Sequence, residues 1–470
     1  MSSSSLLSSL LGSSNAVDIS SILEALTGAS SSGIDVTSAV NAGISAAEAP
    51  ETQWENQEST INSQASALSS IQTDITNLDN DLQSLNSLTG PLSAATVTSS
   101  NSSVVTASAA SGATTGDNIV TVNRLATTDS WSSTEVASSS TALPAETFTI
   151  TPASGTAQTF TTDGTQTLSD LQSEINAAGL GVTANIVTDA NGSRLSIVAN
   201  TSGSAANFTV SASDSSDFGF TNPQAGQNAW VNVNGIDIYS ASNTVTGALP
   251  GVTLNLLSTS PSQVTLNTSS NTSAVSSALS QFVSDYNTAI NAVNAQFAVS
   301  GSSEGVLATD PTVRNLQSDL LGALDYTATP VSGNTTTTVP NLSSLGITVN
   351  KDGTLSLDST TLDSALQNNF SDVQNFFQGS ALNGFANSLD QQLTSFLSPA
   401  DGAFTVDLQS LTSEYSSLQS DISNFQSNVI SPLATQLNSE YSQAEIALQE
   451  LPAEIKNIDA ELGENNSSNN

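Results

Sequence analysis

The sequence predicts an elongated α+β protein, with an antiparallel coiled-coil stalk built from both termini and antiparallel β domains in a central head. Three observations lead to this prediction. At 470 residues the chain is too long for one compact core. Apolar residues follow helical seams near both ends of the chain, and the long stretch between these seams alternates like β-strands.

The first stalk helix is predicted to begin near Trp54. Apolar residues recur there every seven positions, with a second set three positions later, as in helices that pair with another helix. Gly90-Pro91 ends the pattern. Gln57 and Gln64 stand at seam positions near its start, so we expect that end to fray when it is unpaired. The seam consists of Trp54, Ile61, Leu68, Ile71, Ile75, Leu78, Leu82 and Leu85.

The partner helix is predicted near the other end of the chain. Steps of four and three alternate there, until extra steps of four at Leu433 and Leu437 form a stutter that locally unwinds a left-handed supercoil. Pro432 lies within the stutter, so we expect a kink or a break between two helices. Pro452 is a second place where the helix could break. This seam consists of Phe404, Leu408, Leu411, Tyr415, Leu418, Ile422, Phe425 and Val429.

A single seam of this kind could equally be an amphipathic helix on a globular core. Two seams that bracket the rest of the chain favour one antiparallel stalk. Neither helix can form the usual flanking salt bridges, because the first has no basic residue between Trp54 and Leu88 and the second has only Lys456. Apolar burial must therefore hold the stalk together against repulsion between like charges.

The central segments are short, alternating and rich in Val, Ile, Thr and Phe, with Gly or Asn at the turns. They include "DNIVTVNRLAT", "ETFTITPASGTAQTFTT", "AWVNVNGIDIY" and "GVTLNLLS". They predict one or two antiparallel β domains. One helical insertion, "TLSDLQSEINAAG", places Leu168, Leu171 and Ile175 on one face. Residues 271–325 then turn helical and are expected to pack beside the stalk.

The charge balance argues against several classes of function. The chain has 42 acidic and 5 basic residues, for a net charge of −37, which disfavours nucleic acid and anionic membrane surfaces as partners. It has no run of about 18 apolar residues, so we expect no membrane insertion. With no Cys and no His, the common nucleophile systems and almost all zinc sites are absent. We therefore expect no enzyme and no cofactor, and we interpret Asp214 and Asp217 as a solvated loop.

The segment "LGITVNKDGTLSLDSTTLDSAL" contains a loop, Asn350-Lys351-Asp352-Gly353, that could be a metal site, an anion site or a turn. The spacing of a calcium-binding loop would put Thr348 and Ser359 where acidic ligands are needed. One exposed lysine in so acidic a chain makes a poor anion site. Alternating residues on both sides and the pair Asp352-Gly353 favour a tight hairpin turn.

The chain resembles the flagellar hook-associated protein 2 family, the filament cap proteins, from about Gly33 to Leu462. The order of the matching motifs is more specific than any one of them. Two features depart from the family pattern: the first 32 residues extend beyond its usual start, and the acidic-Ala-Pro turn lacks its common basic residue. The motifs are "GIDVTSAVNAGISAAEAPETQWENQ", "GDNIVTVNRLAT", "TLSDLQSEINAAGLGVTANIVTDANGSRLSIVANTSG", "NTVTGALPGVTLNLL", "FVSDYNTAI", "LATDPTVRNLQSDL" and "LGITVNKDGTLSLDSTTLDSAL".

The resemblance implies a homo-oligomeric ring at the distal tip of the bacterial flagellar filament, under which exported flagellin folds and is inserted. It also implies the hook-filament junction proteins and a flagellar export chaperone as partners. The start of the chain lacks the charged region of a general secretory signal, so we expect secretion through the flagellar export channel. In the family the hairpin lies beside the stalk, which implies that Asn350, Asp352 and Gly353 brace it.

Two other functions remain possible at this stage. One is another flagellar axial protein. The other is a surface adhesin whose outer β domains bind glycans, with Trp131, Trp230 and Tyr239 as the aromatic candidates; for Trp230 and Tyr239, core packing is the stronger interpretation.

The expected domain organisation follows from these patterns. It comprises a mobile arm at 1–50, the N-terminal stalk helix and first strand at 51–115, an inner β head domain at 116–143 and 225–270, an outer β head domain at 144–224, a helical and hairpin part packed on the stalk at 271–403, the C-terminal stalk helices at 404–462 and a disordered tail at 463–470.

Overall fold

The computed structural model describes residues 35–213, 218–298, 304–330 and 337–467. The chain forms two compact units. The first comprises Met1–Leu78, Asp285–Gly322 and Gln391–Asn470, and the second comprises Asp79–Ser284 and Ala323–Asp390. Helices come from both ends of the chain and antiparallel sheets from its centre. The predicted α+β class is therefore confirmed.

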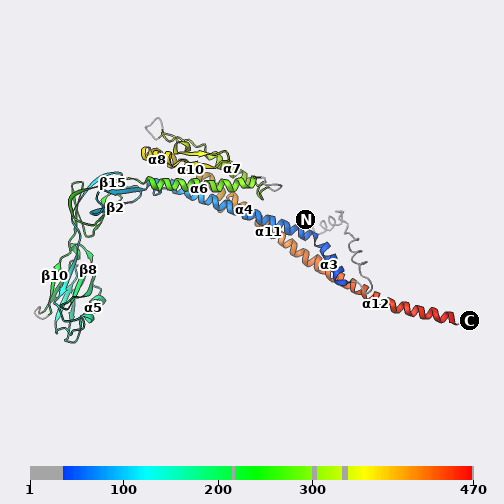
Figure 1. Cartoon of the computed structure of the whole chain (residues 1–470), viewed down its shortest axis with the longest axis horizontal. Helices are drawn as coiled ribbons and strands as arrows, with labels where there is room; N and C mark the ends of the chain where they lie inside the picture. Colours follow the sequence, from blue (N-terminus) through cyan, green and yellow to red (C-terminus); the bar gives the residue numbers. More distant parts are fainter. Residues whose placement is uncertain (1–34, 214–217, 299–303, 331–336, 468–470) are drawn as a thin grey trace. The chain divides into compact units, whose positions relative to one another are not determined.

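In the first unit, the helix α4 (Ala49–Asn86) runs antiparallel to α11 (Ala403–Phe425). The ring of Trp54 meets that of Phe425 edge-on, with centroids 5.3 Å apart. Further along α4, the Gln419 amide donates to the Glu58 carboxylate at 3.2 Å. Trp54 thus meets Phe425 and the later Glu58 meets the earlier Gln419, as antiparallel pairing requires. Figure 1 shows the two helices side by side.

A second helix pair in this unit corrects the expected mobile arm. Its residues 1–34 lie outside the described part of the chain, but Val36–Ala47 form the helix α3, which lies against α12 (Ser431–Ser467). The side chain of Asp35 caps α3 by accepting from the Ser38 N–H. Gly43 approaches α12 so closely that an added Cβ would lie 2.8 Å from a methyl carbon of Leu437. A cap and a close helix contact thus order a segment whose small residues had suggested an arm.

The C-terminal helical stretch does not break at either proline. A π-helical turn, Gln426–Ile430, joins α11 to α12, and the Ser431 N–H donates to the Gln426 carbonyl five residues back. Pro432 follows immediately, where it lacks the N–H of a regular α-helix. The wider turn accommodates the proline at the predicted stutter, and the two helices are joined without a break. This helix continues through Pro452 and reaches Ser467, five residues into the expected tail.

Shorter helices complete the two units. The central stretch contains α6 (Thr272–Phe297), α7 (Pro311–Ala323), α8 (Ser359–Asn368), α9 (Phe370–Gln378) and α10 (Phe385–Leu397). In the second unit, Gln378 is buried and its amide donates to the carbonyls of Leu85 and Ser87. These bonds satisfy carbonyls that the end of α4 leaves without helical partners.

The first head core lies between two antiparallel sheets. One has the strand order β1-β15-β3-β11-β12, and the other β13-β14-β2. Their apolar residues form one buried cluster that includes Val120, Val231 and Leu254. The strands are β1 (Ala95–Ser99), β2 (Val105–Ala109), β3 (Gly116–Arg124), β11 (Ala229–Val233), β12 (Ile236–Ser240), β13 (Thr244–Leu249), β14 (Val252–Leu256) and β15 (Ser260–Ser270).

The second head core is separate and contains its own sheets, β10-β4-β8-β7 and β6-β5-β9, with the helix α5 (Leu168–Ala177). Thr167 and Asp170 form a capping box at the start of α5. Trp131 on β4 packs on this core, so the second core begins before the expected boundary at 144. The strands are β4 (Thr128–Ser133), β5 (Thr147–Thr151), β6 (Gln158–Thr161), β7 (Val182–Thr188), β8 (Ser193–Ser202), β9 (Thr209–Ala212) and β10 (Phe220–Gln224).

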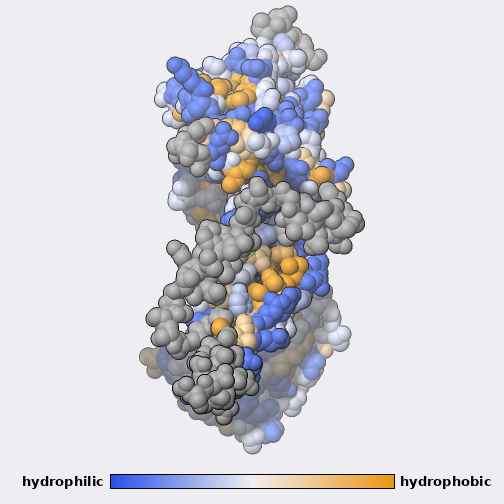
Figure 2. Space-filling view, turned by 90° about the vertical axis from the view of Figure 1, so that its right-hand side faces the viewer, coloured by the Kyte–Doolittle hydropathy of each residue, from blue (hydrophilic) through white to orange (hydrophobic). Residues whose placement is uncertain are grey.

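On the face shown in Figure 2, hydrophobic residues gather in separate patches between hydrophilic ones. Within the described parts of the chain, no helix combines the length and apolarity needed to cross a bilayer.

Candidate functional site

The predicted seam on α4 is most deeply buried in its second half. The side chains from Leu68 to Leu85 that belong to the seam are at most 1 % exposed, whereas Ile61 is 6 % exposed and Trp54 is half-buried. Gln57 is exposed, and the Gln64 amide donates to the Val306 carbonyl at 3.2 Å. Burial of the seam residues therefore decreases toward the start of α4, where polar residues interrupt the apolar pattern.

The predicted seam on α11 is less uniform. Phe404 and Leu418 are buried, while Val429 is 38 % exposed and lies in the π-helical turn. The remaining members, Leu408, Leu411, Tyr415, Ile422 and Phe425, are half-buried. The structure thus places the whole set on one helical stretch. Its role as the working seam of a stalk remains a prediction.

Amide side chains supply donors where basic residues are lacking. Glu51 is buried, and it accepts a hydrogen bond from the Gln426 amide. Gln419 donates to Glu58 in the same way. Sequence reasoning missed these contacts because it searched for charged partners. The contacts could have been predicted from the glutamines of α11 that face glutamates of α4 across the seam.

A pair of aspartates in the second unit was also missed. Asp79 lies on α4, and its carboxyl group is hydrogen-bonded to Asp390 on α10. Burial, and then the contact with Asp390, raise the pKa of Asp79 to about 7. The Gln83 amide donates to the same carboxyl group at 2.8 Å. The residues are more than 300 positions apart, so no local pattern could have predicted the pair.

The loop at Asn350 is a hairpin turn between β16 (Ile347–Val349) and β17 (Leu355–Leu357). The Asn350 N–H donates to the Thr354 carbonyl at 2.7 Å, and Gly353 has a φ of +83°. Hydrogen bonds from Thr354 lower the pKa of Asp352. Asn350, Asp352 and Gly353 therefore act together in one turn, and their predicted bracing of the stalk stays a prediction.

The aromatic candidates for glycan stacking differ in their surroundings. Trp131 is half-buried, and its indole N–H donates to the Phe208 carbonyl at 3.1 Å. Trp230 stacks on Tyr239 across β11 and β12, with ring centroids 6.1 Å apart, and Tyr239 is 59 % exposed. Trp131 is therefore engaged in packing on the second head core. The proposed acidic pair Asp214 and Asp217 lies outside the described residues.

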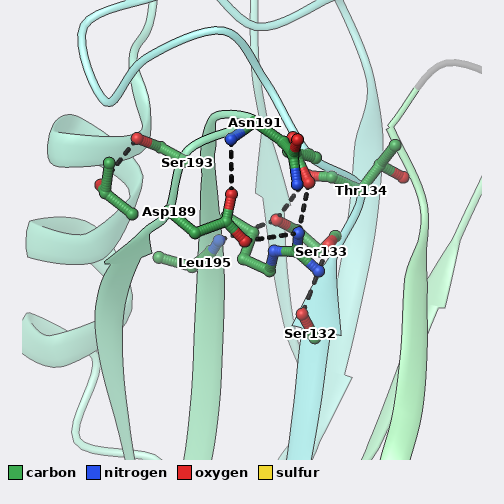
Figure 3. A network of polar contacts seen from close by, with 10 residues as sticks. Ser132, Ser133, Thr134, Asp189, Asn191, Ser193 and Leu195 are labelled. Atoms are coloured by element: carbon green, nitrogen blue, oxygen red, sulfur yellow. Dashed lines mark hydrogen bonds and ion pairs between the residues drawn. The ribbon is translucent and has the colours of Figure 1, made fainter.

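One polar network holds the β7–β8 hairpin of the second head core (Figure 3). Arg194 pairs with Glu135 and, at 3.4 Å, with Asp189; these are the ion pairs found in the described part of the chain. Asp189 also accepts from the Asn191 N–H at 2.8 Å, and the Ser133 hydroxyl accepts from the Leu195 N–H. The network ties the hairpin to β4 and to the residues that follow it.

Comparison with known protein families accounts for most of the chain. The models for the flagellar hook-associated protein 2 N-terminus and C-terminus match residues 32–129 and 226–453. The flagellin hook IN motif matches residues 147–201, within the second head core.

Individual relatives agree with these matches. The flagellar hook-associated protein 2 of Escherichia coli K12 is 28% identical over 479 residues, covering 93% of this chain and 97% of the relative. The B-type flagellar hook-associated protein 2 of Pseudomonas aeruginosa is 28% identical over 387 residues. The match covers 73% of this chain and 79% of the relative. The fold is similar to a crystal structure of the D1-D2-D3 domains of the flagellar cap protein from Escherichia coli, with a TM-score of 0.59 and 27% identity. The match covers 74% of this chain and 99% of that structure.

Proposed function

Because the chain belongs to the flagellar hook-associated protein 2 family, we propose that it forms an oligomeric structural cap at the distal tip of the bacterial flagellar filament. In this role a ring of subunits promotes the folding and insertion of exported flagellin, and so filament elongation and motility. The observation that supports the proposal best is the pairing of helices from the two ends of the chain, α4 with α11 and α3 with α12. Paired terminal helices suit a subunit that docks on a helical filament.

The proposed partners are flagellin, the hook-filament junction proteins and a flagellar export chaperone, and the proposed route is the flagellar export channel. The absence of cysteine from the chain agrees with passage in an unfolded state, because no disulfide has to be opened or formed. The seam residues of α4 and α11 are proposed to keep the stalk closed. The hairpin around Gly353 is proposed to brace it.

Deletion of the gene in the parent bacterium tests the function. We expect flagellin to be lost to the medium as monomer and swimming to stop, and the intact gene to restore both. Normal filaments in the deletion strain would contradict the cap.

A matched pair of variants on α11 tests the role of the seam in the same strain. Leu418→Asp puts a charge at a buried seam position, and we expect it to abolish rescue. Val406→Asp changes an exposed residue of the same helix, and we expect full rescue. Equal rescue by both variants would contradict the proposed seam while leaving the cap itself untouched.

A further inference from the structure

The helices α3 and α12 run antiparallel. Glu51, just after α3, contacts Gln426, whereas Gly43 within α3 lies close to Leu437. Moving back along the chain from Glu51 to Gly43 thus means moving forward along the C-terminal helices. The residues before Val36 therefore lead toward the C-terminal end of α12, and Figure 1 shows α12 extending past α3 in that direction.

The apolar stripe of α12 continues beyond its partly buried section. Leu437, Tyr441 and Ala444 are partly buried, whereas Leu448 is 45 % exposed and all side chains of 446–450 are exposed. The sequence continues the same steps of four and three, which is the pattern of a face that packs on another helix. The later stripe positions are Leu451, Ile455, Ile458 and Leu462.

A second copy of the α3 sequence precedes α3. The segment "VDISSILEAL" at 17–26 resembles "IDVTSAVNAG" at 34–43, since Asp, Ser and Ala recur at equivalent places. In addition, Leu23 stands where α3 has Val40, which is 3 % exposed. The family match begins at residue 32, so the earlier copy lies before the matched region.

The start of α3 indicates what the earlier copy can form. The Asp35 carboxylate accepts from the N–H and the hydroxyl of Ser38, at 3.1 Å and 2.7 Å. Asp18 and Ser21 have the same spacing, which predicts a capped helix that begins at Ile19. Its apolar residues follow the spacing of one helical face: Ile19, Ile22, Leu23 and Leu26.

One difference between the copies bears on where the earlier one can pack. Leu26 stands where α3 has Gly43, at which an added Cβ would lie 2.8 Å from a methyl carbon of Leu437. A leucine there would force Leu437 to move, and α3 already occupies that place. The earlier copy is therefore better suited to the stripe beyond α3.

The available length suits this position. From Leu448, α12 continues for about 28 Å to its end at Ser467, whereas a helix of about ten residues needs about 15 Å. Residues 27–33, between the two copies, can span up to about 23 Å when extended.

Charge also suits this position. A register that continues residue by residue from Gly43 beside Leu437 puts Glu24 level with Lys456. Lys456 is exposed and is the one basic residue of α12. Opposite charges on neighbouring helices favour this register over one that puts Glu24 beside the acidic side chains of the same helix.

We propose that residues 18–27 form a helix that packs antiparallel on α12 beyond α3, against the stripe from Leu448 to Leu462. The C-terminal helical stretch then has three successive partners: α4, α3 and this helix. The inference goes beyond the proposed cap and does not depend on it, because it concerns contacts within one chain.

Disulfide trapping in the full-length chain tests the contact, because the sequence has no cysteine. Leu26→Cys is combined with Ile455→Cys on the stripe or, as the control, with Asn457→Cys, which is exposed and points about 200° away around the helix. We expect the first pair to form a bond within one chain at several times the yield of the second. Equal yields, or no bond, would overturn the contact. A bond between two chains would assign the helix to a second copy and would overturn it as well.

Hydrogen exchange of full-length variants tests the buried face. Leu23→Glu puts a charge on that face, whereas Ala25→Glu puts the same charge at a position whose α3 equivalent, Ala42, is exposed. We expect the amides of 446–462 to exchange about tenfold faster in Leu23→Glu and to be unchanged in Ala25→Glu. Equal rates in the two variants would overturn the proposal. Rescue of motility by Leu23→Glu would leave the cap intact, so the two proposals can fail separately.

Discussion

At the scale of single residues, burial sets the charge of Asp79. Its pKa rises from an ordinary value of 3.8 to about 7, because the folded chain removes the carboxyl group from water and places it against Asp390. A group whose pKa is raised on folding favours the folded state below its unfolded pKa, and that contribution is lost as pH rises through the folded pKa. Between the two values the protein gains a proton on folding, and above about pH 7 ionised Asp79 weakens the fold.

Asp79→Asn should therefore stabilise the protein mainly at high pH. The amide keeps the size of the side chain and removes the charge, so we expect the melting temperature to rise by about 3 °C at about pH 8 and to change little at about pH 4. Thermal unfolding followed by circular dichroism measures this difference. Glu55→Gln, an exposed acid-to-amide change on the same helix, is the control. A gain that does not depend on pH would contradict the argument.

Gly353 is a second residue at which local backbone conformation restricts the side chain. Its φ of +83° is costly for a β-branched side chain, so Gly353→Val should destabilise the unit that contains it by about 1–2 kcal/mol. Gly353→Asn should cost less, because Asn tolerates this conformation. Urea unfolding measures both. Added calcium should change neither variant nor the parent, and a calcium-dependent rise in stability would revive the metal-loop interpretation.

These two residues also show what sequence can predict at this scale. The pair Asp352-Gly353 between alternating segments indicates its own turn, since the necessary chemistry is local. Asp79 and Asp390 meet only because α4 and α10 lie against each other. The charge of Asp79 depends on its burial, which the residues next to it in the sequence do not indicate. Hydrogen bonds from amide donors such as Gln426 were not predicted for a related reason: a neutral side chain leaves no charge pattern in the sequence.

At the scale of elements, the apolar seam residues of α4 lose burial from the middle of the helix toward its start. Leu68 is fully buried, Ile61 slightly exposed and Trp54 half-buried, where it meets Phe425 at the end of α11. The heptad pattern predicted this helix well, because apolar spacing reflects one buried face. It predicted α3 poorly: small residues such as Gly43 suggested a loose arm, whereas in the fold they allow a close helix contact.

Amide hydrogen exchange should follow this gradient. In the free protein we expect amides before about Ile61 to exchange faster than those from Leu68 to Leu85, since fewer buried contacts resist local opening there. Mass spectrometry of peptides from α4 measures the two rates. Strong protection before Ile61 would contradict the expectation that this end frays when it is unpaired.

At the scale of the whole molecule, negative charge is the dominant feature. The net charge is −37, and the ion pairs found in the described residues all involve Arg194. Sequence patterns anticipated the α+β class and the helices from both ends, because both follow from long periodic segments. They did not anticipate that β4 belongs to the second core, since strands of either core show the same alternation. Its pairing with β8 and β10 and the packing of Trp131 on Phe208 assign it to that core.

Added salt should therefore stabilise the chain. Screening weakens repulsion between acidic groups and has few attractive pairs to weaken, so we expect the melting temperature to rise by about 3 °C between low salt and about 0.5 M sodium chloride. The same concentration of a neutral osmolyte is the control for general solvent effects. A lower melting temperature in salt would mean that attractive charge pairs matter more than the structure indicates.

The π-helical turn at Gln426–Ile430 has a geometric consequence. One extra residue in a helical turn rotates everything beyond it by about 100° around the helix axis. The extra residue therefore offsets the successive four-residue steps at Leu433 and Leu437, and the apolar stripe of α12 stays close in phase to that of α11. One wide turn thus lets a single helical stretch contact two partners, α4 along α11 and α3 along α12.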